Sequence, residues 1–206
     1  MSRAPQPPEA KGRELRALLA ERVVLVDEQD HEVGVASKLE AHQEGQLHRA
    51  FSVLVFDSSG ALLLQRRAAG KYHSAGLWSN SCCGHPRPGE ELKAAAERRL
   101  REELGLDLAL EHDFSFIYQA ALEGGMHEHE LDHVFVGHSD AAPVPDPGEV
   151  SDWRWVSPRV LLDEMALDPA AFTVWFHTLM HRTSASRFAT TRSLTGTEET
   201  NRAPTH

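Results

Sequence analysis

The apolar residues of this chain fall in short runs between residues 22 and 182, with polar and turn-forming residues between the runs. Strands are predicted where a run is continuous or alternates over a few residues. The predicted strands are residues 22–27, 50–56, 61–65, 114–119, 132–138 and 153–156. Because Asp-Ser-Ser-Gly separates the second strand from the third, these two are expected to form a hairpin.

Longer segments carry the repeat of a helix. The predicted helices are residues 90–104, 158–165 and 170–180. In the first, apolar residues recur at every fourth position from Leu92 to Leu104, which places them in one buried stripe. Pro88 stands before this helix and Gly105 follows it, as helix entry and exit favour. Strands interrupted by helices predict an α/β (α+β) fold in which helices layer against a mixed sheet.

The size of the chain fits one domain with two tails. It has 206 residues, of which 41% are hydrophobic, and this is enough for a sizeable core. Residues 1–20 are rich in Pro, Ala and charge, with a short helix expected at 14–20, and residues 184–206 are polar and nearly free of apolar periodicity. We therefore expect mobile tails around a domain at 21–183.

The net charge of −10 argues against a nucleic-acid-binding surface or a polybasic membrane anchor. No run approaches the roughly 18 apolar residues that span a bilayer. The first residues lack the apolar stretch of a signal peptide. We therefore expect a cytoplasmic protein with neither nucleic-acid nor membrane partners.

The two cysteines, Cys82 and Cys83, are adjacent. Neighbouring cysteines can join only through a strained ring, so no structural disulfide is expected in a reducing compartment. Cys82 is interpreted as a small buried side chain. Cys83 is followed by Gly84 and His85 in a turn that precedes a charged helix, and this context favours a functional thiol.

The helix at residues 90–104 carries a cluster of charges. Glu103 lies one turn beyond Arg99, so the two side chains share a side of the helix, while Glu102 lies one position around. Carboxylates that lie close together favour a bound cation, and oxygen-rich sites suit Mg²⁺. The alternative is a solvated charged face, which is the usual fate of such runs.

Histidines and glutamates form a second candidate site. His42 and His48 precede the predicted hairpin, and His85 follows Cys83. Glu128 and Glu130 are two residues apart, so on an extended strand they project together. Three imidazoles and two carboxylates suit Zn²⁺, Mn²⁺ or Mg²⁺. Each histidine taken alone is more typical of a surface position. A metal site is therefore expected only if the fold brings these histidines and glutamates together.

Residues 129–133 match the zinc-protease pattern H-E-x-x-H. That motif works on a helix, where both histidines share a face and the glutamate acts as base. Here Gly124-Gly125 precedes it and strand-like residues follow. On a strand, His129 and His133 share one face and Glu130 points to the other, so a protease is disfavoured.

Two motifs carry a resemblance to known families. The chain resembles the Nudix box, G-x5-E-x7-R-E-U-x-E-E-x-G-U with U bulky and apolar, at Gly84, Glu90, Arg98, Leu100, Glu102, Glu103, Gly105 and Leu106. Arg99 stands where the box has a glutamate. Residues 78–86, WSNSCCGHP, are similar to the W-[ST]-N-[ST]-x-C-G-H-P motif of the type I isopentenyl-diphosphate isomerases. This resemblance implies a Nudix-type α/β/α sandwich with a mixed sheet.

The resemblance also implies an activity, the interconversion of isopentenyl and dimethylallyl diphosphate. Such enzymes protonate an alkene and remove a proton from the tertiary carbocation that results. It implies that Cys83 and Glu130 flank the substrate, that Tyr118 is hydrogen-bonded near Glu130, and that the indole of Trp175 stabilises the cation. The expected partner is a small-molecule isoprenoid diphosphate, bound by a monomer or weak dimer.

The same resemblance implies the binding groups. The diphosphate is expected on four cationic side chains, those of Lys38, Arg67, Lys71 and Arg99, with Mg²⁺ bridging it to Glu103. A second divalent ion, Mn²⁺, Zn²⁺ or Mg²⁺, is expected on His42, His48, His85, Glu128 and Glu130. In a hydrolase the box glutamate ligates metal and activates water, so an arginine at that position suits an enzyme that keeps the diphosphate intact.

Some segments depart from that family's pattern. Its Lys- and Trp-Pro-containing loop reads here as residues 71–76, KYHSAG, and His129 replaces the usual asparagine between the two glutamates. Two other functions stay open: a Nudix pyrophosphohydrolase of nucleoside diphosphate derivatives, and a non-catalytic diphosphate-binding module. Arg99 and the Cys-Gly-His turn argue against the hydrolase.

Overall fold

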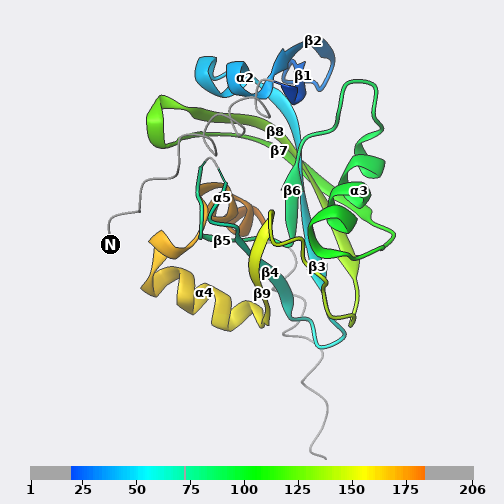
Figure 1. The fold of residues 1–206 in the computed structure, drawn as a ribbon, viewed down its shortest axis with the longest axis vertical. Coiled ribbons are helices and arrows are strands. Elements are labelled where there is room, and N and C mark those ends of the chain that lie inside the picture. Colours follow the sequence, from blue (N-terminus) through cyan, green and yellow to red (C-terminus); the bar gives the residue numbers. More distant parts are fainter. Residues whose placement is uncertain (1–19, 72, 184–206) are drawn as a thin grey trace, which may run out of the picture.

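The structure is a computed structural model that describes residues 20–71 and 73–183. Within these residues a nine-stranded mixed sheet lies between helices on its two faces (Figure 1). The predicted α/β/α sandwich is therefore confirmed. The predicted tails lie outside the described residues apart from Ala20. In the described part of the chain, no helix is long and apolar enough to cross a membrane.

The centre of the sheet is β3 (His48–Phe56). One edge of β3 pairs in parallel with β8 (His127–His138), from His48 opposite Glu130 to Phe56 opposite His138. β8 in turn pairs antiparallel with β7 (Glu111–Ala121). This parallel pair inside an antiparallel sheet makes the sheet mixed.

The other edge of β3 carries the remaining strands. β6 (Cys82–Gly84) pairs antiparallel along its middle, with Ser52 opposite Cys83. The end of β3 meets β4 (Leu62–Arg67), and these two strands form the predicted hairpin. β4 also pairs with β9 (Val150–Val156) and with β5 (Trp78–Ser79).

Side-chain alternation along β3 fills two cores. Val53 and Val55 pack on the side of α3 (Leu92–Leu104), while Leu54 and Phe56 pack on the opposite side. That opposite side is covered by α4 (Pro158–Leu167) and α5 (Val174–Thr183), as Figure 1 shows. Because both faces are covered, β3 reads as a continuous apolar run. Each fully buried aliphatic side chain contributes about 1.5–3 kcal/mol.

The helix α3 begins at Leu92 rather than at the predicted residue 90. Glu91 is its N-cap, and the carboxylate of Glu91 accepts a hydrogen bond from the amide of Ala94 at 2.7 Å. Glu90 is left in the preceding loop. Gly105 ends the helix at a φ of 66°, where a Cβ would lie 2.9 Å from the carbonyl oxygen of Val144. Glycine is therefore required at this end.

The N-terminal part contains two elements that the pattern did not predict. The predicted strand at 22–27 is β1 (Arg22–Val26), which pairs with β2 (Glu32–Ser37). The segment after β2, for which no element was predicted, is helix α2 (Lys38–Glu44). This helix is too short for apolar periodicity, and it is specified by its ends: Ser37 caps the amide of Glu40, and Gly45 has a φ of 64°.

The ends of other elements also differ from prediction. β8 begins at His127, five residues before the predicted strand. Its first residues are polar, and Glu128 and Glu130 face a cavity, so no apolar run marks this part of the strand. The last helix begins at Val174, after the short 3₁₀ turn Pro169–Ala171. The H-E-x-x-H segment lies entirely in β8, so it has no helical face and the protease interpretation is excluded.

Candidate active site

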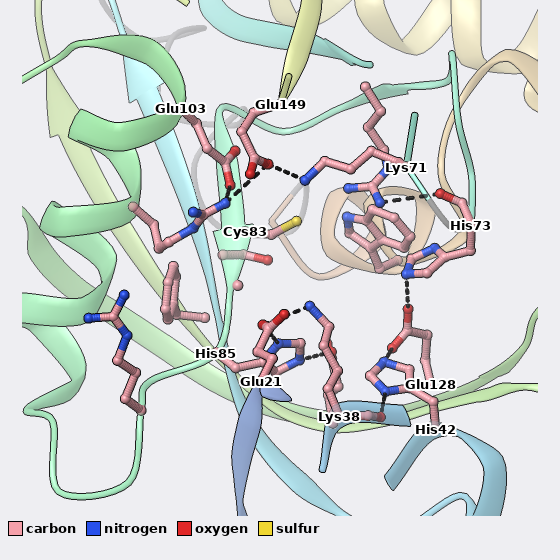
Figure 2. A pocket seen from close by; sticks show the side chains of 18 of the residues that line it. Glu21, Lys38, His42, Lys71, His73, Cys83, His85, Glu103, Glu128 and Glu149 are labelled. Atoms are coloured by element: carbon pink, nitrogen blue, oxygen red, sulfur yellow. Dashed lines mark hydrogen bonds and ion pairs between the residues drawn. The ribbon is translucent and has the colours of Figure 1, made fainter. Parts of the chain in front are cut away.

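A cavity of about 730 Å³ lies between α2, α3, β6 and β8. Most of the sequence-predicted site residues line it (Figure 2). They are Lys38, His42, Arg67, Lys71, Cys83, His85, Arg99, Glu103, Tyr118, Glu128, Glu130 and Trp175. His48 lies behind this lining and is completely buried. The fold therefore gathers residues that are up to 137 positions apart in the sequence, from Lys38 to Trp175.

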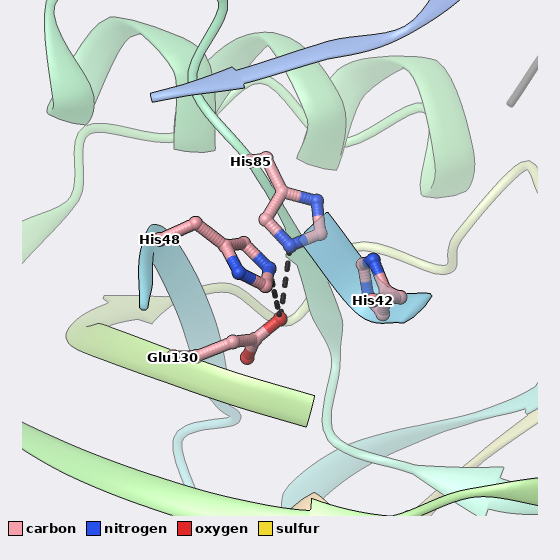
Figure 3. A group of neighbouring side chains, drawn as sticks. All are labelled: His42, His48, His85 and Glu130. Carbon is pink, nitrogen blue, oxygen red and sulfur yellow. Dashed lines mark hydrogen bonds and ion pairs between the residues drawn. The ribbon is translucent and has the colours of Figure 1, made fainter. Parts of the chain in front are cut away.

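The predicted imidazoles converge at one end of the cavity. The ligand atoms of His42, His48, His85 and Glu130 all lie within 4.8 Å of one another (Figure 3). His85 Nε2 is 2.9 Å from Glu130 Oε1, and His48 Nε2 is 3.6 Å from the same oxygen. Glu128 Oε2 is 3.2 Å from His42 Nε2. This set could hold a divalent cation.

Backbone carbonyls fix two of these rings. His42 Nδ1 donates to the carbonyl oxygen of Lys38 at 2.6 Å, and His48 Nδ1 donates to that of Gln46 at 2.8 Å. A carbonyl can only accept, so each Nδ1 carries a hydrogen, and each ring in its neutral form then has its lone pair on Nε2. The buried Nε2 of His48 has no hydrogen-bond partner in the part of the chain that the structure describes. Such a nitrogen fits a metal ligand.

The charge states at this end also suit a cation. Burial, together with the charge of Lys38, lowers the pKa of His85 to about 4, so its ring is neutral at pH 7. For Glu130, burial favours the neutral acid, but the neighbouring His48 and His85 prevail and hold the pKa of this carboxyl well below its usual range. For Glu128, burial and the charge of Glu130 raise the pKa. A divalent cation would neutralise both carboxylates.

Cations and carboxylates meet at the other end of the cavity. Arg99 Nη2 lies 2.5 Å from Glu103 Oε1 and 3.2 Å from Glu149 Oε2. Lys71 pairs with the same Glu149 carboxylate. Gln65 Nε2 donates to Glu103 Oε2 at 2.9 Å, which orients a buried carboxylate. This end presents two cations and two carboxylates, a combination that suits phosphate oxygens bridged by Mg²⁺.

Arg98, the neighbour of Arg99 on α3, binds a carboxylate of the preceding loop. Its Nε and Nη2 form a fork on the two carboxylate oxygens of Glu90, at 2.7 and 2.9 Å. The amide of Arg87 donates to Glu90 as well. Arg98 therefore holds the loop before α3.

Three further side chains line the space between the two ends. The sulfur of Cys83 points into the cavity (Figure 2), and burial raises the pKa of this thiol to about 12, so it is protonated at neutral pH. Tyr118 Oη donates to Glu130 Oε2 at 2.6 Å. Trp175 Nε1 donates to Ser79 Oγ at 2.9 Å, which fixes the plane of the indole.

Among the lining residues to which sequence reasoning gave no role are Glu21, His73 and Glu149. His73 Nε2 is 3.8 Å from Glu128 Oε1, and its ring meets Trp175 edge-on at 5.5 Å between centroids. Glu21 and Glu149 belong to no motif, and His73 lies in the segment 71–76 that departs from the family pattern. Their place in the site follows only from packing, and no local pattern could have identified them.

Comparison with known proteins agrees with this geometry. Residues 46–176 match the NUDIX domain. A crystal structure of a Deinococcus radiodurans protein superposes with a TM-score of 0.66 and 26% identity, covering 79% of this chain and 98% of that one. Fold and site together define a NUDIX protein.

Two curated relatives identify the family within the NUDIX proteins to which this chain belongs. Isopentenyl-diphosphate Delta-isomerase 2 of Aromatoleum aromaticum is 51% identical over 169 residues, which cover 82% of this chain and 89% of that protein. Isopentenyl-diphosphate Delta-isomerase of Burkholderia multivorans is 52% identical over 164 residues, which cover 80% of this chain and 93% of that protein. The chain belongs to the isopentenyl-diphosphate Delta-isomerase family.

Proposed function

We propose that this protein interconverts isopentenyl and dimethylallyl diphosphate. One observation carries the proposal: Cys83 and the hydrogen-bonded pair of Tyr118 and Glu130 line a single cavity whose far end is rich in cations. The names of the curated relatives support the same reaction.

The reaction needs two proton-transfer groups and no other reactant. One group delivers a proton to the terminal alkene carbon, and the electron pair of the double bond forms the new C–H bond. The tertiary carbocation then loses a proton from its neighbouring carbon to the second group, and the double bond forms one position along. Because the reaction is reversible, Cys83 and Glu130 exchange the roles of acid and base between its two directions.

The remaining lining groups hold the substrate and protect the cation. Lys38, Arg67, Lys71 and Arg99 bind the diphosphate. The indole of Trp175 contributes about 1–2 kcal/mol of cation–π stabilisation once it is desolvated. The guanidinium of Arg67 lies 5.0 Å from the centroid of this indole, so the aromatic face can accommodate a cation. Exclusion of water prevents capture of the carbocation.

Two divalent ions belong to this proposal. His42, His48, His85, Glu128 and Glu130 would hold one of them, either Mn²⁺, Zn²⁺ or Mg²⁺. Glu103 would hold Mg²⁺ together with the diphosphate. When bound, the first ion sets the acidity of the Glu130 and Tyr118 pair, and the second neutralises the diphosphate. A monomer or weak dimer and a cytoplasmic location remain predictions.

Incubation of the protein with isopentenyl diphosphate and Mg²⁺ in deuterated water, followed by NMR, tests the function. The isomerase produces dimethylallyl diphosphate that carries deuterium at carbon. Release of phosphate from nucleoside diphosphate derivatives without isomerisation would instead establish the pyrophosphohydrolase. Saturable binding of isopentenyl diphosphate with no turnover, unchanged in Cys83→Ala and Glu130→Gln, would establish the binding module.

A further inference from the structure

The third imidazole of the cluster differs from the other two. His42 and His48 each donate from Nδ1 to a backbone carbonyl. The Nδ1 of His85 is buried and has no hydrogen-bond partner among residues 20–71 and 73–183. If Nε2 binds a metal, Nδ1 must carry the hydrogen, and a buried N–H needs an acceptor. A metal-binding His85 therefore needs a further group that accepts the hydrogen bond from its Nδ1–H.

Glu21 is placed to be that acceptor. Its Oε1 lies 4.0 Å from His85 Nδ1 and 2.9 Å from Lys38 Nζ, as Figure 2 shows. A hydrogen bond needs about 2.7–3.2 Å, so the carboxylate would move by roughly 1 Å. The side chain of Glu21 is 46% exposed and has room for this change.

The backbone holds Glu21 in place. Its carbonyl oxygen accepts from the amide of Lys38 at 2.8 Å, and the carbonyl of Lys38 accepts from His42. Glu21 is thus tied to the start of α2, the helix that carries one of the imidazoles. Burial opposes ionisation of Glu21, but the charge and the hydrogen bond of Lys38 prevail and lower the pKa of this carboxyl to about 2, so the carboxylate is ionised at neutral pH.

We propose that Glu21 is a positioning residue of the metal site, which accepts the Nδ1–H of His85 while His85 Nε2 binds the divalent ion. The same carboxylate oxygen holds Lys38 towards the diphosphate, so one residue joins the two binding functions. This inference rests on the proposed metal site. It adds a carboxylate–histidine–metal arrangement, in which the acceptor fixes the tautomer and raises the basicity of the ligand.

Metal binding by the full-length, substrate-free protein tests this role independently of turnover. After chelation, the protein is titrated with Mn²⁺, and free Mn²⁺ is measured by electron paramagnetic resonance. Loss of the hydrogen-bond acceptor of a metal-binding histidine typically weakens metal binding by about 10–100-fold, and we expect a loss of this size in Mn²⁺ affinity for Glu21→Ala. Glu21→Gln keeps the shape and one acceptor oxygen, so we expect a smaller loss. Circular dichroism of each metal-free variant verifies its fold.

Two controls separate this role from simpler ones. Glu40→Gln removes the same charge from an exposed position on α2, and its Mn²⁺ affinity should equal that of the wild type. Lys38→Met removes the other partner of Glu21, and it should not weaken Mn²⁺ binding. If Lys38→Met weakens binding as much as Glu21→Ala, Glu21 acts through Lys38 and the inference is wrong.

The remaining outcomes are also decisive. Wild-type Mn²⁺ affinity in both Glu21 variants would overturn the inference and leave the metal site intact. A wild-type protein that binds no Mn²⁺ would overturn the metal site and this inference together, without bearing on isomerisation. A ¹⁵N-detected signal from a protonated His85 Nδ1 in the Zn²⁺-loaded wild type, lost in Glu21→Ala, would support it directly.

Discussion

Arg99 and Glu103 face each other one turn apart on α3, with Arg99 Nη2 2.5 Å from Glu103 Oε1. The residue that departs from the Nudix box is thus paired with a box carboxylate, at the end of the cavity assigned to the diphosphate. A guanidinium here supplies a phosphate donor in place of a metal ligand.

Substitution Arg99→Gln should therefore weaken substrate binding. Loss of a charge-assisted hydrogen bond costs about 1.5–3 kcal/mol, so we expect the KM for isopentenyl diphosphate to rise roughly 10–100-fold. Arg101→Gln is the matched control, because Arg101 lies on the same helix but is exposed and pairs with Asp107. Steady-state kinetics of both variants provide the measurement, and an equal KM in both would contradict the role of Arg99.

Tyr118→Phe removes one hydrogen bond and little else. The hydroxyl donates to Glu130 Oε2 at 2.6 Å, and the ring lies in the core. We expect kcat to fall by about 10²–10⁴-fold, the range typical of acid–base groups, while KM changes little. A larger KM with an unchanged kcat would place Tyr118 in substrate binding instead. Thermal unfolding shows whether the core is kept.

The two adjacent cysteines allow a direct comparison. Cys83→Ala should abolish isomerisation with the protein still folded, because Cys83 lines the cavity. Cys82 is fully buried in the core beside α3, so Cys82→Ala should keep turnover and lose about 1–2 kcal/mol of unfolding free energy. Turnover by Cys83→Ala at the wild-type rate would exclude proton transfer by this thiol.

Thiol reactivity should follow the raised pKa of Cys83. Only the thiolate reacts, and burial raises the pKa of Cys83 to about 12. In the Cys82→Ala background we expect alkylation by iodoacetamide at pH 8 to be slower than that of free cysteine and to increase as the pH rises further. The second-order rate between pH 7 and pH 10 is the measurement. A rate that levels off below pH 9 would mean that the thiol is more acidic than its surroundings indicate.

The fork between Arg98 and Glu90 predicts a pH-dependent stability. The hydrogen bond from Arg98 lowers the pKa of Glu90 below 4.5, so the folded state releases this proton more readily than the unfolded state. Its stabilisation is present above the unfolded pKa and is lost as the pH falls through the folded pKa. We expect Glu90→Gln to cost about 1–3 kcal/mol at pH 7, and less at pH 3. Denaturant unfolding at both pH values measures this.

The imidazole cluster predicts that substitution of its histidines weakens the binding of a divalent ion. His42→Ala, His48→Ala and His85→Ala each remove one of three convergent nitrogens. We expect each to weaken divalent-metal binding and the triple variant to abolish it. His177→Ala should leave it unchanged, because His177 is not among the residues that line the cavity and its Nε2 donates to the carbonyl oxygen of Pro169. Metal analysis of the purified proteins checks this, and full occupancy in the triple variant would refute the ligand set.

The sequence alone determined most of the local elements and the chemistry they carry. Periodicity of two in β8 places Glu128 and Glu130 on one face, and periodicity of about four in α3 places Arg99 beside Glu103. Both follow from backbone geometry that involves only neighbouring residues. The motifs around Cys83 and Glu103 then identified the family from their spacing.

Tertiary structure decided which of these groups meet and which residues complete the site. His48 faces Glu130 because β3 pairs in parallel with β8, a register that is set by packing between distant segments. Helix α2 exists because its caps and its contacts with the sheet compensate for its short length. Glu21, with no motif of its own, lies 4.0 Å from His85 only in the folded chain. Local sequence patterns could not identify Glu21, because periodicity relates only residues that are close in sequence, and Glu21 and His85 are far apart in the chain.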